Sequence, residues 1–188
     1  MTDPIIFKAS KRAAILHLDQ KRKDGSPYFG HLASVALIVA HYSDDPELIA
    51  AGFLHDAIED VSKEIYSEAD LLAEFGERIL KIVLDLSDKS DPMSVENKIA
   101  TWKERKLKYI AHMETEDLDT LLVCCADKIH NARGIVENIK REGQDFYKKF
   151  HTSKAEVLWY YDECLRIIQQ RMPGEAAEEL AFYVKQLK

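Results

Sequence analysis

The sequence predicts an all-α fold, organised as a single bundle of roughly eight to ten helices. Apolar side chains recur with helical spacing along almost the whole chain, and no segment alternates between apolar and polar residues as a half-buried strand does. Only 7 Gly and 5 Pro occur in 188 residues, which leaves few turns. At ~100–200 residues per domain, residues 1–188 correspond to one domain.

The expected helices cover, in chain order, about residues 4–22, 30–42, 46–60, 67–76, 77–87, 95–113, 118–142, 153–171 and 175–188. The first and third each begin with an aspartate N-cap followed by proline at the first helical position, in Asp3-Pro4 and Asp45-Pro46. The turn-rich segment KDGSPYF, residues 23–29, separates the first helix from the second.

Caps and breaks set the remaining boundaries. Ser67 opens a capping-box pattern in which Asp replaces the usual Glu, and Gly76 separates the fourth helix from the fifth. A loop containing Pro92 precedes the long sixth helix. Gly143 ends the seventh, and Pro173-Gly174 separates the last two.

The composition excludes several classes of function. With 33 acidic and 26 basic residues the net charge is −7, whereas a general DNA or RNA binder needs a basic surface. A small phosphorylated ligand is still compatible, because a local cluster of Lys and Arg is enough to bind it. The apolar runs are too short to span a bilayer, and basic residues interrupt any N-terminal signal-peptide core, so we expect no membrane association.

The cysteines indicate a reducing compartment. Cys124, Cys125 and Cys164 are odd in number and have no CxxC spacing, so they are not a disulfide framework. The first two lie in an apolar run, which predicts buried and unreactive thiols. Reduced cysteines are typical of the cytoplasm, which is the location we expect.

Four ionisable residues cluster at the end of the third expected helix, in the sequence AAGFLHDAIED. At about 100° per residue, they fall within one arc of a continuing helix whose other positions are apolar. Burying unpaired carboxylates costs several kcal/mol each, so a cation such as a metal ion is expected beside them. The alternative is a solvent-exposed polar helix end, although acidic groups there oppose the helix dipole. The four residues are His55, Asp56, Glu59 and Asp60.

Two further residues extend this cluster to a metal-ligand pattern. His31 follows the turn-rich loop, and Asp127 interrupts the apolar run LLVCCA. With His55 and Asp56 they form a set of two imidazoles and two carboxylates, which suits Mn or Fe better than a structural Zn. The alternatives are that His31 caps a helix or packs in the core, and that Asp127 pairs with a buried Lys or Arg.

The order of these four residues resembles the pattern of the HD-domain metal phosphohydrolases. The surrounding segments resemble, in the same order, the hydrolase domain of RelA/SpoT homologues: QKRKDGSPYFGHLASVA, LHDAIED, FGERILKIVLDLSD, KERK and ADKIHNARGI. The resemblance runs from about Ala13 to Arg133, with a fainter continuation near Lys154 to Tyr161. Because 188 residues leave no room for a synthetase domain, the chain is most similar to the stand-alone small alarmone hydrolases.

This resemblance implies an activity and a cofactor. Members of the family remove the 3′-pyrophosphate of guanosine tetra- or pentaphosphate, or of adenosine equivalents, and release a nucleoside 5′-di- or triphosphate and pyrophosphate. By resemblance, the four ligands hold one Mn²⁺ ion per chain, which polarises a phosphoryl oxygen and acidifies a water. Glu59 and Asp60 are implied as the pair that activates this water. Glu59 has an alternative role, as a partner that fixes the tautomer of a ligand histidine.

The same resemblance implies contacts with the nucleotide. Arg22 and Lys23 occupy the place where the family holds it, since a guanidinium can stack on a purine and an ammonium can meet a phosphate. Asn131 is implied as a contact to the nucleoside, and Lys154 and Tyr160 as contacts to the 5′-phosphates and the ribose or base. The alternatives are a solvated basic turn for the first pair, a helix-packing hydrogen bond for Asn131, and core packing for Tyr160.

Two other functions are weighed against this one. Another HD phosphohydrolase, acting on nucleotide 5′-phosphates, would not require KRKDGSPY or the pair Glu59-Asp60. A non-catalytic nucleotide-binding regulatory module would not need intact metal and water-activating positions. Leu32 replaces a frequent family Pro and Lys128 a frequent Arg, and these differences bear on the substrate range. A homo-oligomer is compatible with the sequence.

Overall fold

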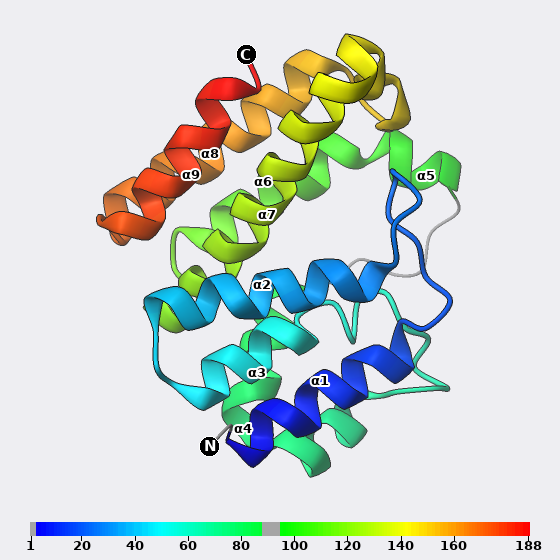
Figure 1. The fold of residues 1–188 in the computed structure, drawn as a ribbon, viewed down its shortest axis with the longest axis vertical. Coiled ribbons are helices and arrows are strands. Elements are labelled where there is room, and N and C mark those ends of the chain that lie inside the picture. The colour runs from blue at the N-terminus through cyan, green and yellow to red at the C-terminus, as the bar shows by residue number, and fades with distance from the viewer. Residues whose placement is uncertain (1–2, 88–94) are drawn as a thin grey trace. The chain divides into compact units, whose positions relative to one another are not determined.

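Figure 1 shows the computed structural model, which describes residues 3–87 and 95–188. These ranges contain helices and no strand, so the all-α prediction is confirmed. The helices are α1 (Pro4–Leu16), α2 (Tyr28–Tyr42), α3 (Pro46–Leu54), α4 (Glu68–Leu86), α5 (Val95–Ala100), α6 (Trp102–Met113), α7 (Leu118–Glu142), the 3₁₀ helix η1 (Gly143–Lys149), α8 (Lys154–Arg171) and α9 (Glu175–Gln186). The expected loop with Pro92 lies outside the described residues. None of the described helices is both long and apolar enough to cross a membrane.

The chain divides into two compact units. Of the described residues, the first unit contains 3–87 and 122–127, and the second contains 95–121 and 128–188. Helix α7 therefore supplies a short segment to the first unit and its remainder to the second.

In the first unit, α3 packs against both α1 and α2, and α4 packs against α3 (Figure 1). Aliphatic side chains from these helices and from the segment 122–127 of α7 form a continuous core. The backbones of α2 and α3 come close at Gly52, where an added Cβ would lie 2.9 Å from the Cα of Ala36. A side chain at this position would force the two helices apart, so the glycine sets their separation.

The predicted helix starts are confirmed by their caps. The Asp3 carboxylate accepts a hydrogen bond from the Ile5 amide at 2.9 Å, and Asp45 accepts one from the Glu47 amide at 2.9 Å. Ser67 forms the expected capping box at the start of α4. Gly76 has a φ of 83°, which bends α4 where the sequence predicted a break between two helices.

Two predicted helix ends are wrong. Helix α1 ends at Leu16 rather than near Arg22, because the following chain forms a loop closed by a bridge between Lys21 and Pro27. Helix α3 ends at Leu54 rather than near Asp60, and tight turns follow it. The four ionisable residues therefore do not share an arc of one helix.

A competing hydrogen bond explains why α3 ends early. The Nδ1 atom of His55 lies 2.9 Å from the carbonyl oxygen of Gly52. A continuing α-helix would use that carbonyl to accept the amide of Asp56. The chain forms turns instead, in which the Ala57 amide donates a hydrogen bond to the Leu54 carbonyl and the Asp60 amide donates one to the Asp56 carbonyl.

Two further differences lie in the second half of the chain. The single helix expected over residues 95–113 is two helices that meet at Thr101, whose hydroxyl donates to the Asn97 carbonyl at 2.7 Å. The Thr101 amide donates to the same carbonyl at 2.9 Å, and back-bonding of this kind often bends a helix. The 3₁₀ helix η1 was not predicted, and it begins where Gly143, with a φ of 72°, ends α7.

In the second unit, α8 packs against α6 and α9. Tyr160 of α8 is buried between Trp102 and Tyr109, with ring centroids at 6.1 and 6.3 Å. The ammonium groups of Lys106 and Lys128 lie 4.8 and 5.6 Å from the Tyr160 ring. Cations on aromatic faces stabilise such clusters modestly.

The three cysteines are buried, as the sequence predicted for Cys124 and Cys125, and they form no disulfide within the described ranges. Cys124 and Cys125 lie on the segment of α7 that belongs to the first unit, and Cys164 lies on α8 in the second.

Candidate metal centre

His31 is the first component of the candidate site and lies on the opening turn of α2. Two backbone hydrogen bonds close the loop before α2. The Arg22 amide donates to the Ser26 carbonyl, and the Tyr28 amide donates to the Gln20 carbonyl. This closure fixes where α2 begins, and therefore which way its first turn faces. The His31 side chain is 1% exposed and points into the first unit.

His55 and Asp56 follow α3 directly. A carbonyl oxygen can only accept a hydrogen bond, so the contact of His55 Nδ1 with the Gly52 carbonyl places a proton on Nδ1. In the neutral imidazole, Nε2 then carries the lone pair. The turn at the end of α3 thus selects the His55 tautomer that can ligate a metal through Nε2.

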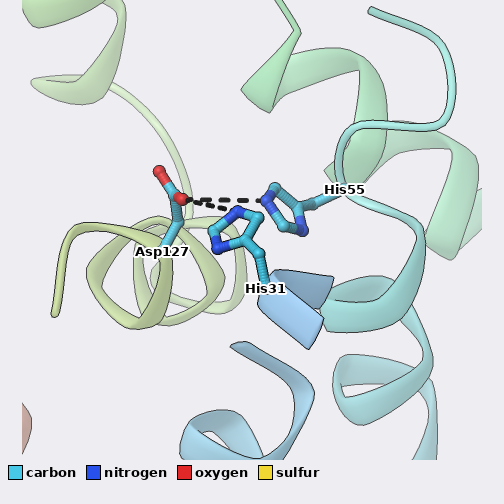
Figure 2. A group of neighbouring side chains, drawn as sticks. All are labelled: His31, His55 and Asp127. Atoms are coloured by element: carbon cyan, nitrogen blue, oxygen red, sulfur yellow. Dashed lines mark ion pairs between the residues drawn. The ribbon is translucent and has the colours of Figure 1, made fainter. Parts of the chain in front are cut away.

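Asp127 completes the group from α7 (Figure 2). Its Oδ1 atom lies 3.3 Å from Nε2 of His31 and 3.7 Å from Nε2 of His55. The three ligand atoms all lie within 4.8 Å of one another. The two rings meet edge to face, with centroids 5.1 Å apart, so both Nε2 atoms are directed at the same carboxylate.

Asp56 lies against the same two imidazoles. Its Oδ2 atom is 3.1 Å from Nε2 of His55 and 3.6 Å from Nε2 of His31. The same oxygen accepts a hydrogen bond from the Tyr28 hydroxyl at 2.6 Å. The structure therefore brings together all four residues that the sequence predicted as ligands.

The charges of this cluster are strongly coupled. Burial disfavours the charged form of His55, but the Asp56 and Asp127 carboxylates outweigh it and raise the pKa of His55 well above its ordinary value. Burial likewise disfavours the Asp56 carboxylate, but the charge of His55 and hydrogen bonds from both imidazoles lower the pKa of Asp56 well below its ordinary value. Two carboxylates and two imidazoles thus form a compact polar site in a mostly apolar surrounding.

This donor set fits a divalent ion. Both imidazoles present Nε2 to the carboxylates, and the tautomer of His55 is fixed by its other nitrogen. The side chains of Asp56 and Asp127 are 20% and 13% exposed, whereas those of His31 and His55 are 1% and 5% exposed. The carboxylates are consequently the side from which solvent reaches the site.

Glu59 and Asp60 lie on the turn after the His-Asp pair and are exposed. Partial desolvation and the nearby Asp56 carboxylate raise the pKa of Asp60, and interactions with Tyr28, His17 and His55 act in the opposite direction. Asp60 is therefore electrostatically coupled to the candidate ligands. The roles of Glu59 and Asp60 stay predictions.

Arg22 and Lys23 lie on the loop between α1 and α2. The guanidinium of Arg22 lies over the Tyr28 ring, 5.8 Å from its centroid. Desolvation and the charge of Arg22 lower the pKa of Lys23, while Asp60 raises it. Arg22 is thus one side chain removed from Asp56, because Tyr28 contacts both residues.

Three predicted nucleotide contacts belong to the second unit. Asn131 lies one turn after Asp127 along α7. The ammonium of Lys154 lies 3.1 Å from Oε1 of Gln144 and over the Tyr147 ring, and Tyr160 is buried among aromatic side chains. Their roles as substrate contacts stay predictions.

The sequence interpretation did not single out Tyr28, His17 or Gln20. Tyr28 precedes His31 by three residues on α2, and this spacing places both side chains on one helix face. Periodicity could therefore have identified Tyr28. His17 and Gln20 follow the end of α1, and they contact Tyr28 and Asp60 from outside any helix, so helical periodicity gave no signal for them.

Comparisons with known proteins agree with the site. A protein-family model described as HD domain matches residues 9–156. A GTP pyrophosphokinase of Brucella melitensis is 36% identical over 182 residues, which cover 97% of this chain and 23% of that protein. A guanosine-3′,5′-bis(diphosphate) 3′-pyrophosphohydrolase of Borreliella burgdorferi is 33% identical over 127 residues, covering 67% of this chain and 18% of that protein. The chain thus spans about a fifth of the length of these relatives.

One solved structure covers nearly the whole chain. A metazoan orthologue of SpoT, described as hydrolysing ppGpp, matches with a TM-score of 0.76 at 20% sequence identity. The match covers 99% of this chain and 97% of that one. At this identity the likeness shows the fold.

Proposed function

The chain belongs to the HD-domain family, and from this membership we propose that it hydrolyses the 3′-pyrophosphate of guanosine tetra- or pentaphosphate or of adenosine equivalents. The products are a nucleoside 5′-di- or triphosphate and intact pyrophosphate. The observation that carries the proposal is the meeting of His31, His55, Asp56 and Asp127 in one site. The name of the Borreliella relative supports the same reaction.

Four side chains of this site would hold a divalent ion, for which we propose Mn²⁺, since imidazole and carboxylate ligands suit it. Such an ion supplies positive charge at a phosphoryl oxygen and lowers the pKa of water. The ligands are His31, His55, Asp56 and Asp127, one ion per chain. Asp56 and Asp127 border solvent, so a phosphate group would approach from that side.

Glu59 and Asp60 are proposed to orient the attacking water and accept its proton. Both are exposed on the turn that follows the ligands, so they are reachable from solvent. Burial and the nearby Asp56 carboxylate raise the pKa of Asp60. Glu59 is the second carboxylate on the same turn.

Arg22 and Lys23 are proposed to hold the nucleotide. The Arg22 guanidinium already lies against an aromatic face, which is the geometry in which it would also stack on a purine. The Lys23 ammonium would meet a phosphate. We further propose that Asn131, Lys154 and Tyr160 contact the nucleoside and the 5′-phosphates, and that the reaction takes place in the cytoplasm.

The test incubates the purified protein and Mn²⁺ with 3′-pyrophosphorylated guanosine and adenosine nucleotides and with ordinary nucleoside triphosphates. The expected products are pyrophosphate and a nucleoside 5′-di- or triphosphate, from the first group only. Asp127→Asn should abolish turnover, whereas Asp145→Asn, which changes an exposed carboxylate of η1, should not. Orthophosphate released from the 5′ end would indicate the other HD phosphohydrolase activity. Nucleotide binding without turnover would indicate a regulatory module.

A further inference from the structure

Tyr28 connects the candidate metal centre to the loop before α2. Its hydroxyl donates to Oδ2 of Asp56 at 2.6 Å, a short and well-formed hydrogen bond. That oxygen is the one that faces Nε2 of both His31 and His55. The tyrosine therefore holds the same carboxylate oxygen that faces the two imidazoles.

The ring of Tyr28 is itself held on two sides. His17 stacks on it, with centroids 5.3 Å apart and an angle of 16° between the planes. His31 meets it edge to face at 5.6 Å. Aromatic contacts of this kind contribute about 0.5–1.5 kcal/mol beyond the buried area, so the phenol has little freedom to rotate away.

His17 is in turn tied to the loop and to the turn that carries Asp60. The buried His17 ring directs Nδ1 at Oε1 of Gln20, at 2.6 Å. The side-chain amide of Gln20 donates a hydrogen bond to the backbone carbonyl of Asp60 at 2.9 Å. The backbone of Gln20 also accepts the Tyr28 amide at 3.0 Å. This chain of contacts gives the Tyr28 hydroxyl a defined position.

The hydroxyl donates its one proton to Asp56, and a second carboxylate, that of Asp60, lies near enough to affect it. Burial, and next the Asp56 carboxylate, raise the pKa of Tyr28 far above its ordinary value. A side-chain hydrogen bond to Asp60 contributes in the same direction. The phenol consequently lies between a predicted metal ligand and a predicted water-activating residue.

We propose that Tyr28 is a positioning residue, which holds the Asp56 carboxylate toward the two imidazoles and keeps it in a fixed relation to Asp60. The proposal rests on the proposed function, because it concerns the metal site of that reaction. Groups that hydrogen-bond to metal ligands typically contribute 10–100-fold to metal affinity.

The test compares Tyr28→Phe with Tyr66→Phe. Tyr66 is a buried tyrosine of the first unit whose hydroxyl has no hydrogen-bond partner within the described residues, so this variant removes a hydroxyl without removing a bond. Mn²⁺ affinity is measured by the electron paramagnetic resonance signal of the unbound ion. We expect Tyr28→Phe to bind Mn²⁺ about 10–100-fold more weakly than the wild type and Tyr66→Phe to bind it as the wild type does.

A kinetic measurement separates positioning from a general loss of structure. With saturating Mn²⁺, Tyr28→Phe should lower kcat and leave the nucleotide KM close to that of Tyr66→Phe, because its hydroxyl is directed at carboxylates. Equal Mn²⁺ affinity in the two variants would overturn the proposal. If the wild type itself bound no Mn²⁺, the proposed function would fail instead.

A second variant covers the case in which Tyr28→Phe does not fold, as judged by circular dichroism in a chelator. His17→Leu keeps most of the side-chain volume and the Tyr28 hydroxyl, but removes the ring stacked on the phenol. We expect it to weaken Mn²⁺ binding in the same direction and by a smaller factor. Wild-type Mn²⁺ affinity in a folded His17→Leu protein would contradict the positioning role.

Discussion

Replacing Gly52 by alanine tests whether the distance between α2 and α3 controls the metal centre. A Cβ at this position would lie 2.9 Å from Cα, 3.2 Å from the backbone nitrogen and 3.4 Å from Cβ of Ala36. The first two contacts are with main-chain atoms, so no side chain can rotate to relieve them. The two helices must therefore move apart by about a few tenths of an ångström. Because His31 lies on α2 and His55 directly follows α3, this movement would also separate the two histidines.

The expected magnitude combines two opposing effects. Overpacking a close contact typically costs about 1–3 kcal/mol, and the backbone clash places Gly52→Ala in the upper part of that range. Replacing a helical glycine by alanine returns about 1 kcal/mol through lower unfolded-state entropy. The net loss in the free energy of unfolding is therefore about 1–2 kcal/mol. At about 2–4 °C per kcal/mol for a chain of this size, Tm should fall by about 2–8 °C.

Gly134→Ala is the matched control for this change. Gly134 lies within α7, and an added Cβ there would have no atom within 4 Å. It should raise the free energy of unfolding by about 0.5–1 kcal/mol. Thermal unfolding in a chelator measures stability without metal, and titration with Mn²⁺ then measures affinity, which should fall only in Gly52→Ala.

Two results would refute the reasoning. If Gly52→Ala were as stable as Gly134→Ala, the close approach to Ala36 would not limit packing. If Gly52→Ala lost stability but kept wild-type Mn²⁺ affinity, the separation of α2 and α3 would not determine the geometry of the two histidines.

Three further predictions concern single side chains. Asp127→Ala should leave too few ligands, so that metal analysis of the purified variant finds no bound Mn²⁺; full occupancy would remove Asp127 from the ligand set. Glu59→Gln should retain Mn²⁺ and lower kcat by ~10²–10⁴, as expected for the loss of a general base, whereas loss of metal with a normal kcat per bound ion would transfer that role to Asp60. The pKa of Asp45 lies below its ordinary value of 3.8, chiefly because the Arg78 guanidinium donates a hydrogen bond to it. The ionised carboxylate therefore stabilises the folded state above pH 3.8, and this stabilisation is lost as the pH falls through the lower pKa of the folded state. Asp45→Asn keeps a good N-cap, so denaturant midpoints at about pH 6 and pH 3 should show a smaller acid-induced loss than the wild type; an equal loss would contradict the Arg78 contribution.

The parts of the fold that sequence predicted correctly depend on local chemistry. The N-caps Asp3 and Asp45 act on amides two residues away, so their spacing alone predicts the helix starts. The ends of α1 and α3 depend on contacts that spacing does not reveal. One is the bridge from Lys21 to Pro27, and the other is the bond of the His55 imidazole to a backbone carbonyl.

In the candidate site too, some features could be predicted from the local sequence and others depend on contacts between distant residues. Asp127 was predicted because an acid in an apolar run needs a partner, and its neighbours in the fold are His31 and His55. The helical-arc argument grouped His55 with Asp56 by a wrong route, since both follow the helix. The contact of Tyr28 with Asp56 joins residues 28 positions apart and became visible only in the structure.

The buried cysteines give each unit its own reporter of transient opening. A thiol inside the core reacts with an alkylating reagent only while the surrounding structure is open. Labelling of Cys124 and Cys125 therefore reports on the first unit, and labelling of Cys164 reports on the second. Peptide mapping after timed exposure to the reagent would rank the two units by opening rate, and added Mn²⁺ should slow modification of the pair beside Asp127 more than that of Cys164.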